Sequence, residues 1–174
     1  MLLDIHYYGD PILRRHCEPI VEITDAIICL VNDMIETMDK SNGIGLAAPQ
    51  VGFPIRLFVL RNYVFNEDEK WTFSEPIVFI NPKISIVGNG LVSDTEGCLS
   101  LPGIRLEITR PDKITVEATG LDGKVFYETL DDYNARVRMH ENDHINGVLF
   151  IDRADLNARK KIEPELRALK QKYT

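Results

Sequence analysis

The stretch that decides the fold is His140-Glu141-Asn142-Asp143-His144, an H-E-x-x-H pattern inside a segment of helical character. Residues four positions apart lie on one face of a helix, so His140 and His144 can bind one metal ion with Glu141 beside them. A divalent metal acidifies water, and a neighbouring carboxylate can accept the proton that the water releases. The pattern therefore predicts a helix that carries a metal site and a general base.

The alternative is a pair of core histidines, each satisfied by an ordinary hydrogen bond. Tyr133, Val137, His140 and His144 form a stripe at positions i, i+4, i+7 and i+11, so both imidazoles are expected to face the core. Buried imidazoles need partners. A bound metal ion would be the shared partner of both imidazoles and would explain why both lie on one buried face. We therefore favour the metal site over the pair of core histidines.

The segments around this helix predict an α+β fold rather than alternating βαβ units. Helices are expected over residues 24–40, with Thr24 as N-cap, over 132–146, and from Pro164 to about Lys172. Strands are expected over 55–61, 77–80, 84–87, 104–110, 113–119 and 124–130. The last two strands are joined by a hairpin signal, Asp122-Gly123. Residues 62–75 are expected to form a surface loop or a ragged hairpin.

The length and composition indicate one globular domain over residues 1–174, and the H-E-x-x-H pattern within it makes this domain the expected catalytic one. Hydrophobic residues make up 44% and charged residues 27%, which argues against disorder. A net charge of −7 argues against DNA or RNA as the primary ligand, and no apolar run is long enough for a membrane span. The N-terminus does not resemble a signal peptide, and three cysteines, an odd number, favour a reduced, cytoplasmic protein.

The two histidines need a third protein ligand to make a catalytic metal site. Glu163 and Glu165 follow His144 at a spacing used by some metalloproteases, but they stand at a helix start in a basic tail. That is a poor place for a buried ligand. The stronger candidate is Cys98, which lies in the glycine-flanked run Glu96-Gly97-Cys98-Leu99-Ser100-Leu101-Pro102.

Three segments resemble the signature motifs of the peptide deformylases. They are Gly43-Ile44-Gly45-Leu46-Ala47-Ala48-Pro49-Gln50, Glu96 to Pro102, and His140 to His144, in the order and at the spacing usual for the family. Tyr8-Gly9-Asp10-Pro11-Ile12-Leu13-Arg14 extends the resemblance over almost the whole chain. Met139 replaces the Gln of many relatives without affecting an expected role. The resemblance implies short, mostly antiparallel strands around a central H-E-x-x-H helix, with a further helix at the C-terminus.

The resemblance also implies a function, removal of the formyl group from the N-terminal formylmethionine of newly synthesised polypeptides. Cys98, His140 and His144 are then expected to bind one divalent metal ion. The family points to iron(II) as the native ion, and the donor set also accepts zinc, nickel or cobalt. Glu141 is expected to take a proton from water and to return it to the departing amine.

Further residues are expected to contact the peptide. By resemblance, the Gln50 side-chain amide and the Leu99 backbone N–H donate to the oxyanion of the tetrahedral intermediate. Gly43 and Gly45 allow another backbone to approach closely, and in the family this loop pairs with the substrate as an added strand. The other expected peptide contacts, each with an ordinary core or surface role as its alternative, are Ile44, Arg105, Tyr133 and Val137.

Two other functions stay open at this point: a zinc endopeptidase with a downstream glutamate ligand, and a metal-stabilised binding module without catalysis. The basic tail, residues 157–174, holds six basic residues against two acidic ones. It is expected to be an amphipathic helix that docks Leu166, Leu169 and Tyr173 on the body. As a further hypothesis, it binds the ribosome weakly through RNA phosphates.

Overall fold

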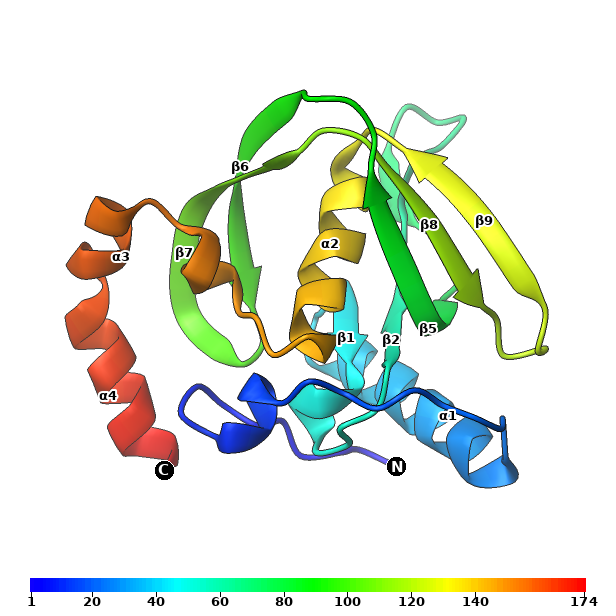
Figure 1. The fold of residues 1–174 in the computed structure, drawn as a ribbon, viewed down its shortest axis with the longest axis horizontal. Coiled ribbons are helices and arrows are strands. Elements are labelled where there is room, and N and C mark those ends of the chain that lie inside the picture. Colours follow the sequence, from blue (N-terminus) through cyan, green and yellow to red (C-terminus); the bar gives the residue numbers. More distant parts are fainter.

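The computed structural model describes residues 1–174, and one buried helix lies at its centre (Figure 1). This helix, α2 (Tyr133–Ile145), carries the H-E-x-x-H pattern. Asp132 caps its start by accepting a hydrogen bond from the Asn134 N–H, and Gly147 follows its end in a left-handed conformation, with φ of 74°. The helix therefore has the bounds that its capping signals predict, to within one residue.

A five-stranded antiparallel sheet packs against α2. Its strands, in spatial order, are β1 (Gly45–Ala47), β2 (Leu57–Leu60), β5 (Ile77–Ile86), β8 (Ile114–Thr119) and β9 (Val125–Leu130). A hydrophobic cluster joins Phe58, Phe79 and Val116 of the sheet to Ala135 and Met139 of the helix. Because β1 ends the sheet, one of its sides has no strand partner.

A two-stranded hairpin covers the opposite side of α2 (Figure 1). It consists of β6 (Leu91–Cys98) and β7 (Leu101–Pro111), joined by a two-residue turn. A separate cluster packs Leu101 and Ile104 of this hairpin against Phe150 and Leu166. A smaller hairpin, β3 (Tyr63–Phe65) and β4 (Trp71–Phe73), occupies the region expected to be ragged.

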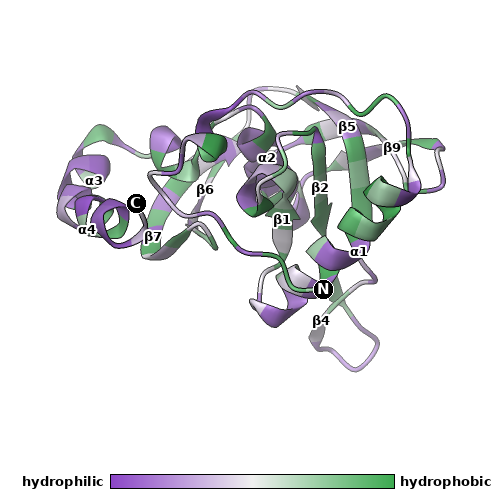
Figure 2. Cartoon of the chain, turned by 90° about the horizontal axis from the view of Figure 1, so that it is seen from below, coloured by the Kyte–Doolittle hydropathy of each residue, from purple (hydrophilic) through white to green (hydrophobic).

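The remaining helices surround this centre. The apolar face of α1 (Asp25–Lys40), which Thr24 caps, packs on β1 and β2. Short 3-10 turns occur as η1 (Pro11–Arg14), η2 (Ala48–Val51) and η3 (Phe150–Arg153), and α3 (Leu156–Lys161) and α4 (Glu163–Tyr173) close the chain. Figure 2 shows β2 and β5 in hydrophobic colours and the two last helices in mainly hydrophilic ones. None of the helices has the length and apolar character that crossing a bilayer requires.

The α+β architecture is confirmed, but several elements differ from the sequence expectation. Residues 77–80 and 84–86 belong to one strand, because a register shift between Ile80 and Lys83 lets β5 continue past the irregular residue Asn81; Val87, expected in the second segment, lies just beyond its end. Neither β1 nor β6 was expected, since the first has three residues and the second is largely exposed and polar. The six-residue helix α3 is too short to show a hydrophobic period.

The helix α2 is also less one-sided than its histidine stripe predicts. Tyr133, which starts the stripe, is 41% exposed, whereas Arg136 and Arg138 on other sides of the helix are buried. Arg138 donates hydrogen bonds to both carboxylate oxygens of Glu128, at 2.7 and 3.0 Å. Because α2 runs between two sheets, charged side chains on it are buried too, and Arg136, Arg138 and Asp143 are each paired with an opposite charge.

The C-terminal helix α4 is docked on the body as expected. Leu166 is 1% exposed and belongs to the cluster with Leu13, Leu101 and Ile104. At the end of the helix, Tyr173 stacks on Tyr7 with ring centroids 3.9 Å apart. The tail is therefore part of the folded core that supports the β6–β7 hairpin.

Replacing Leu166 by Ala should lower the free energy of unfolding by about 2–5 kcal/mol, because it opens a cavity in a fully packed cluster. Denaturant unfolding would measure the change. Arg167→Ala is the control, since that side chain is 76% exposed; it should change stability by about 0.5 kcal/mol or less. Equal effects of the two substitutions would show that the tail does not contribute to the core.

Candidate metal centre

Cys98, His140 and His144 bring one sulfur atom and two nitrogen atoms together. Their ligand atoms all lie within 4.8 Å of one another, and Cys98 Sγ is 3.3 Å from His144 Nε2. Cys98 ends β6, and the two histidines lie one turn apart on α2, with ring centroids 5.1 Å apart. The cluster therefore exists because the β6–β7 hairpin lies across the ligand helix.

Glu96 fixes the orientation of the first histidine. Its Oε1 accepts a hydrogen bond from His140 Nδ1 at 2.8 Å, which leaves Nε2 of that ring free as a ligand atom. Burial acts to raise the pKa of Glu96, but hydrogen bonds from Arg110 and His140 outweigh it and hold this pKa well below its usual range. Glu96 is therefore an anion, and an anionic acceptor selects the tautomer that a metal needs.

His144 is buried, and burial holds its pKa well below the usual value. A neutral imidazole is the form that binds a metal ion. One thiolate and two imidazoles form a donor set that suits zinc, iron(II), nickel and cobalt. Three protein ligands also leave a coordination position open, which is typical of catalytic sites and not of structural ones. The residues present therefore fit a single catalytic metal ion.

The alternative third ligands lie elsewhere. Glu163 accepts a hydrogen bond from Arg159 at 2.7 Å and pairs with Arg167 in the C-terminal helices. Neither Glu163 nor Glu165 belongs to the cluster of metal-ligating side chains. The downstream-glutamate arrangement is therefore wrong for this chain.

Glu141 lies beside this cluster on α2 and lines the same cleft. Its Oε2 is buried and has no hydrogen-bond partner, and burial raises the pKa of the carboxyl to about 7. A Cβ atom added to Gly45 would lie 2.5 Å from Glu141 Oε1. Glycine at position 45 therefore makes room for this carboxylate. The approach of a substrate backbone to the same residue stays a prediction.

Gln50 is held with its amide nitrogen toward the cluster. Its Oε1 accepts a hydrogen bond from the Ala47 N–H at 2.9 Å, which turns its donor atom, Nε2, toward the cluster. That nitrogen donates to Ser100 Oγ at 3.1 Å and lies 3.5 Å from Cys98 Sγ. Leu99 follows the cysteine in the β6–β7 turn, and its side chain packs closely on Gly43.

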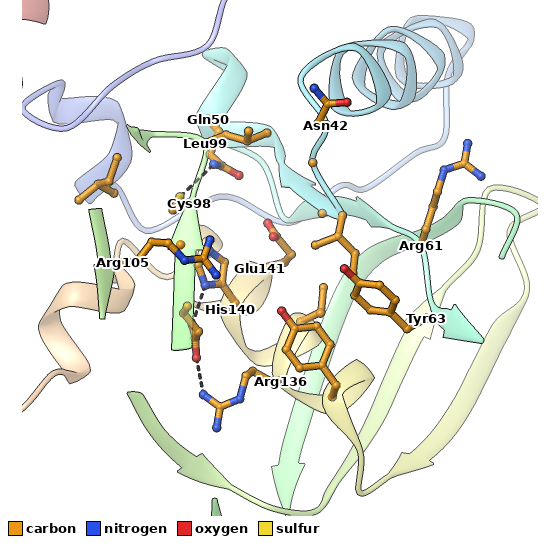
Figure 3. Close-up of a pocket in the computed structure, with 18 of the residues that line it drawn as sticks. Asn42, Gln50, Arg61, Tyr63, Cys98, Leu99, Arg105, Arg136, His140 and Glu141 are labelled. Carbon is orange, nitrogen blue, oxygen red and sulfur yellow. Dashed lines mark hydrogen bonds and ion pairs between the residues drawn. The ribbon is translucent and has the colours of Figure 1, made fainter. Parts of the chain in front are cut away.

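An open cleft of about 820 Å³ connects these groups (Figure 3). The expected metal ligands Cys98 and His140 line it, as do Glu141, Gln50 and Leu99, whereas His144 lies beneath its floor. All of the residues expected to bind substrate also line the cleft: Gly43, Ile44, Gly45, Arg105, Tyr133 and Val137.

The cleft also includes residues that the sequence analysis did not identify. Tyr63 and Phe73 come from the β3–β4 hairpin, and the Tyr63 ring lies 5.4 Å from that of Tyr133. Arg136 lies below them and donates to Glu96 Oε2 at 2.6 Å. The aromatic residues at alternate positions within 63–73 indicate a hairpin with one aromatic face. The sequence pattern does not indicate that this face lines the cleft.

Comparison with known proteins supports one family. The model of the polypeptide deformylase family matches residues 2–160. A peptide deformylase of Chlorobaculum parvum is 40% identical over 98% of this chain and 89% of its own length. A peptide deformylase of Acidobacterium capsulatum is 41% identical over 98% of this chain and 97% of its own length.

Solved structures agree with the sequence comparison. A plant peptide deformylase crystal structure is 40% identical and superimposes with a TM-score of 0.88, covering 98% of this chain and 90% of the plant chain. The match includes the segments that supply the thiol and both imidazoles. The chain belongs to the polypeptide deformylase family, the metal-dependent hydrolases that remove the formyl group from the N-termini of newly made polypeptides.

Proposed function

We propose that Cys98, His140 and His144 hold the single metal ion of this deformylase and that Glu141 is its general base. The observation that carries the proposal is the convergence of the three ligand atoms beside an unpartnered buried carboxylate oxygen. A divalent cation held by these residues supplies a Lewis acid, which lowers the pKa of water and polarises a carbonyl. We propose iron(II) as the native ion, with zinc, nickel or cobalt as substitutes that the same donors accept.

Glu141 moves the protons of the reaction. As a carboxylate it accepts a proton from the attacking water and passes that proton to the amine nitrogen as the formyl C–N bond breaks, so that formate and a free amine leave. A pKa near 7 suits both transfers, because the group gives up its proton almost as readily as it takes one. Gln50 Nε2 and the Leu99 N–H donate to the oxygen that becomes negative during the attack.

The peptide binds along the free edge of β1. Gly43 and Gly45 lie at this edge, where an extended peptide can add as a further strand, and its main chain hydrogen-bonds to the sheet. Ile44, Tyr133 and Val137 line the neighbouring wall of the cleft and form the methionine pocket. On the opposite wall, Arg105 lies against Gly97 and reaches the peptide backbone.

We also propose that residues 1–174 act as one cytoplasmic catalytic domain, whose basic tail contacts the ribosome. The cleft draws residues from Asp39 to Glu141, and Leu166 of the tail packs with Leu101 under the same hairpin. The exposed basic residues of the tail are Lys160, Lys161, Arg167, Lys170 and Lys172. They could bind RNA phosphates without changing the packing of Leu166.

Cys98→Ala tests the ligand set. It should abolish both tight metal binding and hydrolysis of formyl-Met peptides, because two imidazoles alone do not complete the site. Metal content and formate release would be measured anaerobically on the same sample, with acetyl-Met peptides as the substrate control. Cys29→Ser is the matched variant, since Cys29 is exposed on α1 and should be replaceable without loss. A Cys98→Ala protein that keeps its metal would contradict the ligand set.

Glu141→Gln tests the role of Glu141 as general base without affecting the residues that bind the metal. The change removes the negative charge with little change in volume, so the metal content and the fold should remain. Turnover should fall by roughly two to four decades, the usual contribution of general acid–base catalysis. Steady-state rates of formate release on metal-quantified protein would measure it. Near-normal turnover would show that another group accepts the proton.

Charge reversal in the tail tests ribosome binding better than truncation, because truncation would expose the cluster around Leu166. Changing three tail lysines to Glu should abolish co-sedimentation with ribosomes at low salt and leave hydrolysis of short formyl peptides intact. The tail residues changed are Lys160, Lys161 and Lys170. The control reverses three exposed lysines of the body, Lys40, Lys83 and Lys124. If the parent protein and the tail variant co-sediment with ribosomes to the same extent, the tail does not bind the ribosome and its role is structural.

A further inference from the structure

The turn that follows the ligand helix contacts one proposed metal ligand, His140, and one acidic residue of the helix, Asp143. This turn, η3, ends at Arg153 and begins at Phe150, which is buried. The Phe150 ring stacks on the His140 ring, with centroids 5.8 Å apart and an interplanar angle of 27°. Arg153 binds the Asp143 carboxylate with two hydrogen bonds, from Nε to Oδ2 at 2.6 Å and from a terminal nitrogen to Oδ1 at 2.7 Å.

Asp143 continues this contact inward as a chain of ion pairs. Its Oδ2 also accepts a hydrogen bond from Arg110 at 2.9 Å. Arg110 donates in turn to both oxygens of Glu96, at 2.6 and 2.9 Å, and Glu96 accepts from His140. The side chains of Asp143, Arg110 and Glu96 are 8%, 2% and 4% exposed, whereas that of Arg153 is 46% exposed. Arg153 is therefore the solvent end of a buried chain of charges that terminates on a metal ligand.

We propose that Arg153 is a positioning residue for the metal site, acting through Asp143, Arg110 and Glu96 on His140. The inference rests on the ligand set proposed above. Arg153 lies outside all of the motifs that identify the family from the sequence, and it contacts neither a ligand nor the cleft. Arg153 acts on the site through a chain of ion pairs in which positive and negative side chains alternate. Each side chain in the chain is hydrogen-bonded to the next.

The physical reason is the cost of an unpaired buried carboxylate. In this structure Arg153 supplies the only hydrogen bond to Asp143 Oδ1. Without it, a nearly buried anion keeps one partner, Arg110, and draws that guanidinium away from Glu96. A looser Glu96 holds His140 less firmly, and Asp143 itself lies next to His144 on the helix. Both histidine ligands then lose part of their preorganisation.

The test is cobalt(II) binding to the metal-free full-length protein, followed by the absorption of the cobalt–thiolate centre. Arg153→Ala should weaken cobalt binding by about tenfold, the lower end of what outer partners of metal ligands contribute, and should change the absorption spectrum. Arg153→Lys should recover most of the affinity, because an ammonium group can still pair with Asp143. Should Arg153→Ala not fold, Arg153→Gln removes the charge but keeps a donor, and an intermediate loss is expected.

Arg14→Ala is the matched control. Arg14 makes a similar two-bond ion pair with Asp152 of the same turn, at 2.5 and 3.1 Å, and has no link to Glu96. The Arg14 charge acts on His144, and removal of a positive charge there should not weaken the binding of a cation. Cobalt affinity should therefore not fall and the spectrum should stay unchanged, even where the substitution lowers stability. Unchanged cobalt binding in Arg153→Ala, or an equal loss in Arg14→Ala, would overturn the inference. Cys98→Ala measured in parallel keeps the two proposals separate, because a wrong ligand set would appear there.

Discussion

The Glu96 carboxylate, buried between the β6–β7 hairpin and α2, connects the two halves of the metal site. It stands on the hairpin that carries Cys98 and accepts hydrogen bonds from Arg136 and His140 on the helix that carries the histidines. Arg110, from the second strand of the hairpin, binds both of its oxygens. A buried charge is tolerated only when it is paired in this way, so the hairpin and the helix can pack in essentially one arrangement. The packing of the hairpin on the helix therefore fixes the position of Cys98 relative to His140 and His144.

The same low-polarity surroundings determine the chemistry of the site. Glu96 on β6 has several donors and remains an anion, whereas Glu141 on α2 has an oxygen without a partner. Desolvation then raises the pKa of Glu141 to about 7, while donors keep that of Glu96 low. Two carboxylates within one site thus take different roles, one orienting a ligand and the other exchanging protons.

Close packing around Glu141 also explains one residue of the first motif. Gly45 is buried on the edge strand β1, and a methyl group there would collide with the Glu141 carboxylate. The edge strand that is proposed to bind the peptide and the proposed general base are therefore in direct contact. The C-terminal helix contributes at a greater distance, because Leu166 supports Leu101 and Ile104 of the hairpin that ends in the metal ligand.

The sequence by itself determined the ligand helix, because its capping residues and the four-residue spacing of its histidines act over a single turn of backbone. The same pattern indicated Glu141 as the base, and the glycine-flanked run around Cys98 made that residue the candidate third ligand. Motif resemblance added Gln50 and Leu99, and all four residues line the cleft. The strands β1 and β6 and the pairing of Glu96 with Arg110 and Arg136 depended on tertiary contacts. Glu96 and Arg136 are 40 positions apart in the chain, and no local period relates them. Only the packing of a polar helix between two sheets decides which distant charge Arg136, Arg138 and Asp143 each meet, because an ionised group away from water must be paired. Glu141, which has an oxygen without a partner, has a raised pKa instead.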